Sequence, residues 1–345
     1  MLVSLLLVGC WDERIFKDLS IVSLAGFEGK MGDLTAYYAY PQATSQEMKM
    51  IVITGKGTSP RDVRQNADLK TEQTMDLSVL STLLISEETA KGDIYEYLDS
   101  YFRDPKSPVT PRLAIVQGEL KQFFELTKEM QTTTGEFYNR FIKSLEDNSM
   151  VIPYNLQTAG SVLFQTAQDL ALPYLKLDDE NRPAGDGLAL FSGYSFTGKT
   201  LDAKEGIFLN ILNKSLGKST KITYLYKDSP VSILVHKSNR KHIVSENEID
   251  ISIKIAATLT EFPQGALDDV KTKKELQEFL SKKIEEDMKK MMEKLQEAKC
   301  DAIGLGRVVR AYHPSWYEKD WHEKFSTLKI PIKVEVEIVK TGVLY

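Results

Sequence analysis

The chain has 345 residues, of which 42% are hydrophobic and 27% charged, the composition of an ordinary folded, water-soluble protein with roughly two to three domains. This composition excludes a disordered chain, a collagen-like repeat and a protein that crosses a membrane many times. The net charge of −5 argues against nucleic-acid binding, and two cysteines are too few for a scaffold built on disulfides.

The chain begins with an apolar run, MLVSLLLVG, that is too short to span a bilayer as a helix and is followed by Cys10. No Lys or Arg precedes the run, so a fragment of a longer secretory signal is one interpretation. The four residues 7–10 (LVGC) resemble the bacterial lipobox, in which the cysteine thiol receives a diacylglycerol and becomes the mature N-terminus. We therefore predict a lipoprotein signal over 1–10 with Cys10 as the lipid anchor. The alternative is a buried strand with Cys10 as a core thiol.

Short strand-like and helix-like segments alternate after Cys10, which predicts a mixed α and β protein with short connections. The strand candidates are 20–25, 34–40, 50–54, 80–85 and 113–116, and the helix candidates are 60–69, 93–102, 120–129 and 135–145. An acidic stretch rich in turn formers, 177–187, predicts a domain boundary or a major loop. We place an N-terminal domain at 11–132, a middle region or second domain at 133–187, and a C-terminal domain at 188–345.

The C-terminal domain has the clearest pattern of the chain. Strand-like segments at 188–194, 221–226 and 231–236 surround a helix candidate at 203–212. Isoleucines alternate with polar residues over 249–255, and a second alternating strand covers 330–338, so each strand has one buried face. Apolar residues recur every three or four positions over 272–299, which predicts a long helix, with Thr272 and Glu275 spaced as a capping box. We expect this helix to pack on its own sheet rather than on a coiled-coil partner.

Catalytic motifs are sparse. The sequence has no GxGxxG after a strand, no HExxH and no GxSxG. Residues 193–200 (GYSFTGKT) fit the phosphate-binding pattern GxxxxGK[ST], but a strand with a turn at Gly198 and Lys199 explains them better. We therefore predict no catalytic residue, no cofactor and no enzyme activity.

Histidines and aromatic residues give weaker signals. The pairs His236 with His242 and His313 with His322 have no neighbouring cysteine, so we predict no metal site. Lys237 to His242 is interpreted as a basic hairpin turn, with contact to anionic headgroups as the alternative. An aromatic cluster predicts a short helix that seals the domain, with stacking on a ligand as the alternative; its members are Trp316, Tyr317, Trp321 and Phe325.

Three stretches together carry a resemblance to a known family. They are residues 10–15 (CWDERI) continuing to 18–22 (DLSIV), residues 191–213 with Gly193, Leu201, Glu205 and Gly206, and residues 301–307 (DAIGLGR) followed by Pro314, Trp316, Trp321, Phe325 and the closing strand. In this order and spacing they resemble the C-subunit lipoproteins of spore germinant receptors, the Ger(x)C family.

The resemblance implies an α+β fold of several domains, with mixed or antiparallel sheets each packed with helices. It also implies a non-enzymatic lipoprotein, acylated with palmitate at Cys10 and held on the extracytoplasmic face of the spore inner membrane. Its expected partners are the membrane-embedded A and B subunits of a nutrient receptor, whose assembly it supports during spore germination. The alternative function is an extracellular small-molecule-binding lipoprotein.

Overall fold

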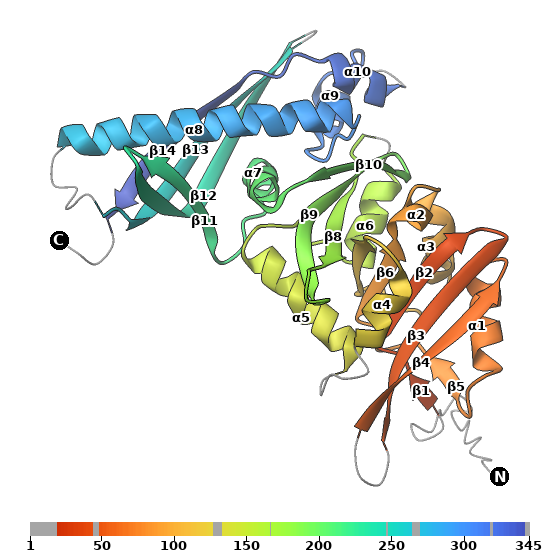
Figure 1. The fold of residues 1–345 in the computed structure, drawn as a ribbon. Coiled ribbons are helices and arrows are strands. Elements are labelled where there is room, and N and C mark those ends of the chain that lie inside the picture. Colours follow the sequence, from red (N-terminus) through yellow and green to blue (C-terminus); the bar gives the residue numbers. More distant parts are fainter. Residues whose placement is uncertain are drawn as a thin grey trace, which may run out of the picture.

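The computed structural model describes residues 19–43, 48–126, 133–165, 167–245, 248–263, 270–317 and 320–341. These residues form an α+β protein built on three sheets, with the larger sheet in the N-terminal part and a smaller one at the C-terminal end (Figure 1). The predicted signal and Cys10 lie outside the described residues.

An eight-stranded mixed sheet forms the centre of the N-terminal part, in the order β10-β9-β8-β7-β6-β2-β3-β4. The strands are β2 (Leu24–Lys30), β3 (Asp33–Ala43), β4 (Met48–Gly57), β6 (Thr82–Ser86), β7 (Arg112–Val116), β8 (Ala171–Leu177), β9 (Pro183–Ser192) and β10 (Ser195–Leu201). The inner pairs β2–β6, β6–β7 and β7–β8 are parallel, and the outer pairs are antiparallel. The inner strands are almost entirely buried, as expected for parallel strands covered on both faces.

The helices of this part of the chain are α1 (Pro60–Asp68), α2 (Glu87–Ala90), α3 (Ile94–Arg103), α4 (Leu120–Glu125), α5 (Thr134–Asp147) and α6 (Leu156–Leu163). Helices α4 and α5 lie on β2, β3 and β6, while α1 packs on β3 and β4. A small parallel sheet of β1 (Leu19–Ile21) and β5 (Thr74–Asp76) lies beside β3. The eight-stranded sheet takes strands from all three predicted domain ranges, and the division at 132 and 187 stays a prediction.

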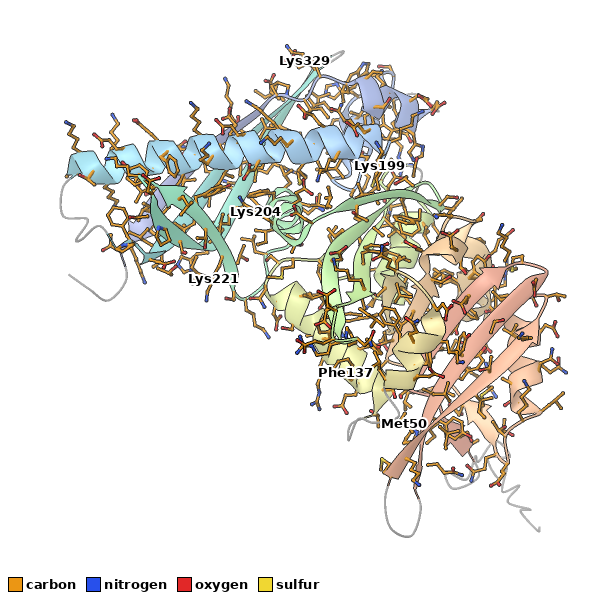
Figure 2. All side chains as sticks on the ribbon, viewed as in Figure 1. Met50, Phe137, Lys199, Lys204, Lys221 and Lys329 are labelled. Carbon is orange, nitrogen blue, oxygen red and sulfur yellow. The ribbon has the colours of Figure 1, made fainter. Side chains whose placement is uncertain are left out.

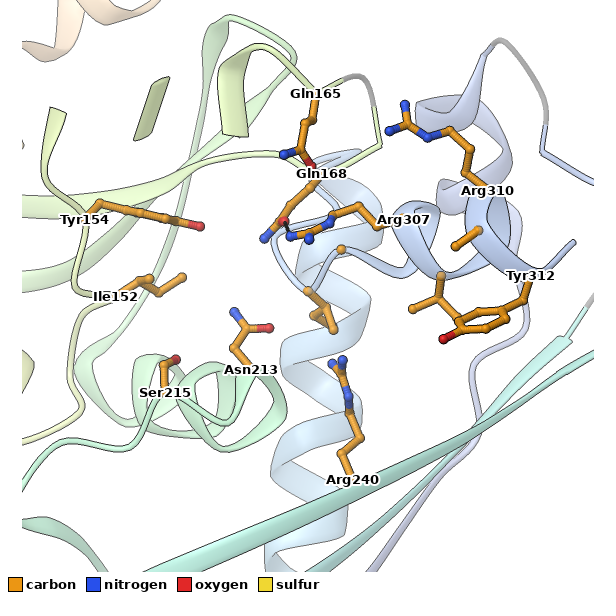
Figure 3. A pocket seen from close by; sticks show the side chains of 14 residues that line it. Ile152, Tyr154, Gln165, Gln168, Asn213, Ser215, Arg240, Arg307, Arg310 and Tyr312 are labelled. Carbon is orange, nitrogen blue, oxygen red and sulfur yellow. Dashed lines mark hydrogen bonds between the residues drawn. The ribbon is translucent and has the colours of Figure 1, made fainter. Parts of the chain in front are cut away.

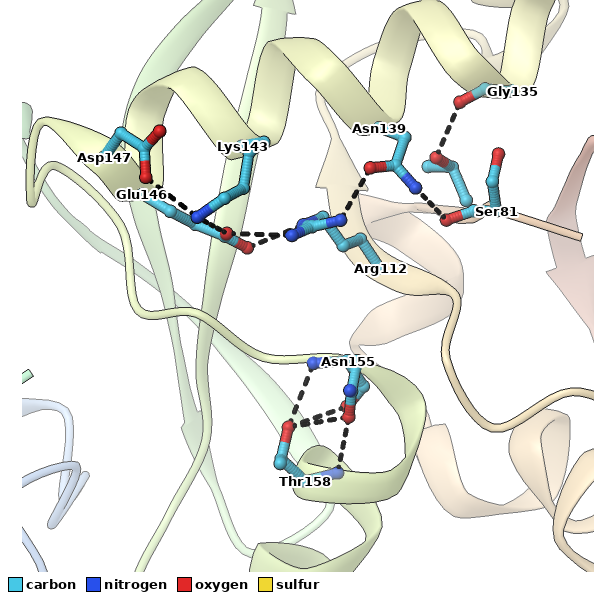
Figure 4. A network of polar contacts seen from close by, with 10 residues as sticks. Ser81, Arg112, Gly135, Asn139, Lys143, Glu146, Asp147, Asn155 and Thr158 are labelled. Atoms are coloured by element: carbon cyan, nitrogen blue, oxygen red, sulfur yellow. Dashed lines mark hydrogen bonds and ion pairs between the residues drawn. The ribbon is translucent and has the colours of Figure 1, made fainter. Parts of the chain in front are cut away.

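A part-buried ion pair fastens α5 to β7 (Figure 4). The Arg112 guanidinium donates to both carboxylate oxygens of Glu146, over 2.8 and 3.1 Å, and to Asn139 Oδ1 over 2.6 Å. Asn139 in turn donates to the carbonyl of Ser81 over 3.2 Å, next to β6. The Glu146 side chain is only 5% exposed, and its charge is balanced by this bidentate pair with Arg112 and by Lys143, whose Nζ lies 3.4 Å from Oε2.

The C-terminal part is a four-stranded sheet in the order β11-β12-β13-β14 with one long helix across it (Figure 1). Its elements are β11 (Thr220–Tyr226), β12 (Ser229–Ser245), β13 (Glu248–Glu261), the helix α8 (Val270–Glu297) and β14 (Ile332–Lys340). The predicted apolar stripe of α8 is buried, with Leu276, Leu280, Ile284, Met288, Met291 and Leu295 in the core. The predicted packing of this helix on its own sheet is confirmed, since α8 contacts β11 and β14.

Side chains of α8 bind the free backbone of β14, the edge strand. The amides of Val334, Val336 and Ile338 donate to Glu285 Oε2 over 3.2 Å, Ser281 Oγ over 2.9 Å and Gln277 Oε1 over 2.9 Å. Four residues of helix rise about 6 Å and two residues of strand about 6.6 Å, so acceptors four apart can meet amides two apart. The helix therefore satisfies an edge that would otherwise be open.

Helix α7 (Ala203–Asn213) lies between the two larger sheets, and α8 contacts it. Lys199 and Lys204 extend from β10 and α7 toward α8 (Figure 2), where they pair with Glu297 and Asp287, each over 2.8 Å. Lys204 also lies over the ring of Tyr224, 4.0 Å from its centroid. The pair of Lys199 and Glu297 is exposed and adds little to stability, whereas Asp287 is only 24% exposed.

Four local predictions are wrong. The strand predicted over 20–25 is two strands in different sheets, because the Val22 amide turns to the carbonyl of Asp76. The predicted major loop at 177–187 is a short turn between β8 and β9, and its second half is strand. Thr272 cannot cap α8, because the helix has already begun by Val270. The basic hairpin turn at 237–242 is instead the middle of β12, paired along its length with β13.

Candidate functional site

Two buried aspartates join the N-terminal sheet to the C-terminal helices. Asp169 precedes β8, and its carboxylate accepts the backbone N–H of Gly193 over 2.9 Å and that of Asp301 over 2.7 Å. Asp169 Oδ1 also lies 2.8 Å from His322 Nε2, in α10 (Trp321–Thr327). Residues from three separate segments therefore converge on one carboxylate.

Asp301 forms the second centre of this network, at the start of the loop between α8 and α9 (Leu305–Tyr312). Its carboxylate accepts the amides of Leu305 over 3.0 Å and Gly306 over 2.7 Å, and the indole N–H of Trp321 over 2.9 Å. Gly304 adopts φ +74°, a left-handed conformation that bends the chain back over the carboxylate. The DAIGLG stretch is thus a tight turn built around the Asp301 carboxylate.

Burial controls the electrostatics of this corner. Loss of solvent raises the pKa of Asp301 to about 6, with the charge of Asp169 acting in the same direction and the three donors opposing it. The hydrogen bond to Asp169 raises the pKa of His322 above its ordinary value. Burial raises the pKa of the neighbouring Cys300 thiol well above normal, so this cysteine is a poor nucleophile. The network ties these separate segments together.

Beside this corner lies a cavity of about 800 Å³ between the two parts of the molecule (Figure 3). It is bounded by the end of α7, by α9, by β12 and by the segments around Tyr154 and Gln168. Arg240 extends into it from β12, and Arg307 lies opposite, donating to Gln168 Oε1 over 2.9 Å. This volume is in the range of small-molecule sites.

Arg240 has an unusual environment. It pairs with Ile253 of β13, and residues directly opposite in an antiparallel pair point to the same face, so Arg240 lies on the buried face of the sheet. Its Nη1 atom is buried without a hydrogen-bond partner among the described residues. Burial lowers the pKa of Arg240. Burial also lowers the pKa of His242, two residues along the same strand, and the positive charges of Arg240 and Lys214 lower it further.

The residues singled out from the sequence lie in several places. The GxxxxGK[ST] match falls on the β9–β10 hairpin, with Gly193 in its turn and Gly198 at a bulge. Its second half is strand β10, so the motif is not a loop that opens directly into a helix, as phosphate binding of this kind requires. In the aromatic cluster, Trp321 and Phe325 are buried in α10, and Tyr317 stacks on Trp321, which confirms the sealing helix. Within the described ranges, no group of three or more His, Cys, Asp or Glu side chains could hold a metal ion.

The cavity and the aspartate pair are absent from the sequence predictions. Asp169 and His322 are 153 positions apart, and no local pattern connects them. The sequence does contain an indication of Arg240, since residue 240 falls in the alternating pattern of strand β12 at a position that faces the core. None of the helices in the described part of the chain is both long enough and apolar enough to cross a bilayer.

Two family models cover nearly the whole chain. Residues 12–177 match the model described as spore germination protein N-terminal domain, and residues 186–342 match the one described as spore germination B3/GerAC like, C-terminal. Spore germination protein GerQC of Bacillus cereus is 23% identical over 99% of this chain and 98% of its own length. Spore germination protein KC of Bacillus subtilis (strain 168) is 20% identical over 99% and 94%. The crystal structure of the GerBC protein has the same fold, with a TM-score of 0.58 and 17% identity over 92% of this chain and 97% of that one.

Proposed function

Since the chain belongs to the GerAC-type family of spore germination proteins, we propose that it is the C subunit of a nutrient germinant receptor. One observation carries the proposal: both family models match, in order, along almost the full length of the chain. A shared segment alone would leave the role of the remainder open, whereas a match of both parts favours the role of the whole subunit.

In this proposal the chain is a lipoprotein whose attachment point is Cys10. The LVGC sequence at 7–10 supports it, because acylation of this type requires a cysteine at that position. Two or three acyl chains give stable membrane attachment, at about 0.8 kcal/mol per buried CH₂ group. The folded body then lies on the extracytoplasmic face of the spore inner membrane.

The proposed subunit works by contact rather than by chemistry. Its partners are the membrane-embedded A and B subunits, and its contribution is to the assembly and response of the receptor. The buried network of Asp169 and Asp301 supports a rigid scaffold, because hydrogen bonds occupy both carboxylates. Cys300, which follows α8, is fully buried.

Replacement of the anchor tests the proposal. Cys10→Ala should move the protein from the membrane fraction to the soluble fraction of spores and impair nutrient-triggered germination. Cys300→Ala is the matched control, because it removes the other cysteine and should leave membrane retention intact. Radiolabelled palmitate should label the unmodified chain and Cys300→Ala but not Cys10→Ala. Unchanged membrane retention and germination of Cys10→Ala would contradict the proposal.

A further inference from the structure

The cavity beside α9 has the charge of an anion site. Arg240 lies at its base and Arg307 and Arg310 at its sides, whereas no acidic residue is among those that line it in the described part of the chain. Asp301 is the carboxylate that acts on the charge of Arg240, but it is already hydrogen-bonded to three N–H groups. No carboxylate among the described lining residues therefore forms a hydrogen bond with the arginines of the cavity.

Arg240 is half-buried, and its Nη1 atom is buried without a hydrogen-bond partner among the described residues. Such an atom is costly, since burial of a charged group lowers stability unless an opposite charge or hydrogen bonds compensate. The buried-face positions of the neighbouring strand β13 are all apolar, and Arg240 stands opposite one of them, Ile253. An apolar residue would therefore satisfy folding better than arginine does here. A ligand that binds the guanidinium would supply the missing partner.

The remaining lining residues add donors and apolar surface. The hydroxyl of Tyr154 points toward the interior of the cavity (Figure 3), and burial raises its pKa, so it stays protonated and can donate. The side chain of Asn213 extends into the same space, and its amide already donates to the carbonyl of Ala302 over 3.1 Å. Ile152 and Ile303 provide apolar walls. Arginine offers a planar fork of N–H donors that fits a carboxylate or phosphate group.

We propose that this cavity binds a small organic anion whose carboxylate or phosphate group is held by Arg240, with Tyr154 and Arg307 as further donors and the carbon skeleton against the isoleucines. This inference goes beyond the proposed subunit role and does not depend on the lipid anchor. It gives the chain a ligand-binding activity of its own.

Titration calorimetry on the full chain in a neutral detergent tests the inference. The probes are succinate and inorganic phosphate, which separate the two oxyanion classes, and succinamide, which has the shape of succinate without its charge. We expect heat of binding with at least one anion and none with succinamide. Arg240→Gln should weaken that binding about tenfold or more, because it removes charge-assisted hydrogen bonds. Arg182→Gln, in the exposed turn between β8 and β9, is the matched control and should bind as the unmodified chain does.

Unfolding temperatures distinguish a ligand-binding role of Arg240 from a structural one. Without ligand, Arg240→Gln should unfold at the same temperature as the unmodified chain or higher, and the anion should raise the unfolding temperature of the unmodified chain only. Arg307→Gln, which changes an exposed residue, tests the same cavity if the first variant fails to fold, and it should weaken binding while leaving the fold intact. Absence of binding by both anions, or binding unchanged in both cavity variants, would overturn the inference.

Discussion

The indole nitrogen of Trp321 donates to Asp301 Oδ2 over 2.9 Å, and both residues are fully buried. Trp321 begins α10, whereas Asp301 follows α8 and holds the first amides of α9. One carboxylate thus fixes two short helices against the end of the long one. The tryptophan and the aspartate belong to the stretches that resemble the Ger(x)C family, and their contact gives those motifs a structural reason.

Asp301→Asn should destabilise the protein by about 2–4 kcal/mol, because the amide offers one acceptor oxygen to three donors and turns its own N–H₂ group toward one of them. Denaturant unfolding followed by tryptophan fluorescence measures the loss. Asp228→Asn, in the exposed turn between β11 and β12, removes the same charge and should change stability by less than about 0.5 kcal/mol. Equal losses in the two variants would contradict this assignment.

His322 should make stability depend on pH. Its pKa is raised in the folded protein, first by the hydrogen bond to Asp169, so the folded state binds the proton more tightly than the unfolded state does. The contribution is fully present below the ordinary histidine pKa of 6.5 and is lost as the pH rises through the raised value. His322→Gln should therefore cost about 1–2 kcal/mol at acidic pH and progressively less in alkaline buffer. A cost that is constant with pH would show that His322 is not charged in the fold.

Glu146→Gln should destabilise the protein by about 3 kcal/mol, because it leaves the Arg112 guanidinium without its counter-charge in a largely buried place. Glu136→Gln removes a similar carboxylate from an exposed pair with Arg140 in the same helix, and should cost less than about 0.5 kcal/mol. Thermal unfolding of the two variants gives the comparison. A double variant, Arg112→Met with Glu146→Leu, should regain much of the loss, since it removes both charges together.

Gln277→Ala should expose the Ile338 amide, which now donates to Gln277 Oε1 over 2.9 Å. We expect a loss of about 1 kcal/mol and faster hydrogen exchange confined to the end of β14. Glu278→Ala changes the next, exposed residue of α8 and should leave the exchange of β14 unaltered. Exchange measured by mass spectrometry decides, and uniform protection of β14 in both variants would contradict the role of Gln277.

Among the elements that the sequence predicts correctly, the clearest have one solvent-exposed face and one buried face. Strand β13 and helix α8 belong to this group, since their apolar residues repeat with periods near two and near 3.6. Helix α6 and strand β8 were not predicted, because both are mostly buried and show little alternation between apolar and polar residues. The length of β12 was underestimated because its second half carries basic residues that resemble a loop.

The candidate functional site could not be predicted from local sequence patterns. The contacts of Asp169 join residues up to 153 positions apart, and only the three-dimensional fold brings them together. A short helix was predicted for the aromatic cluster of Trp316, Tyr317, Trp321 and Phe325, and α10 holds only the last two of them. The partner of the Trp321 indole was not predicted. The position of Arg240 could be predicted only by extending strand β12 as far as residue 240. Arg240 then pairs with Ile253, which places a charged residue on an apolar face of the sheet.

The ladder of α8 side chains on β14 also limits how this side of the molecule can associate. A strand from another protein cannot be appended there, because Gln277, Ser281 and Glu285 already occupy the outward amides. Continued edge-to-edge association of copies of this chain through β14 is blocked for the same reason. Any subunit that approaches from this side must contact the side chains of α8. The solvent-exposed residues of this helix therefore determine which partner can bind here.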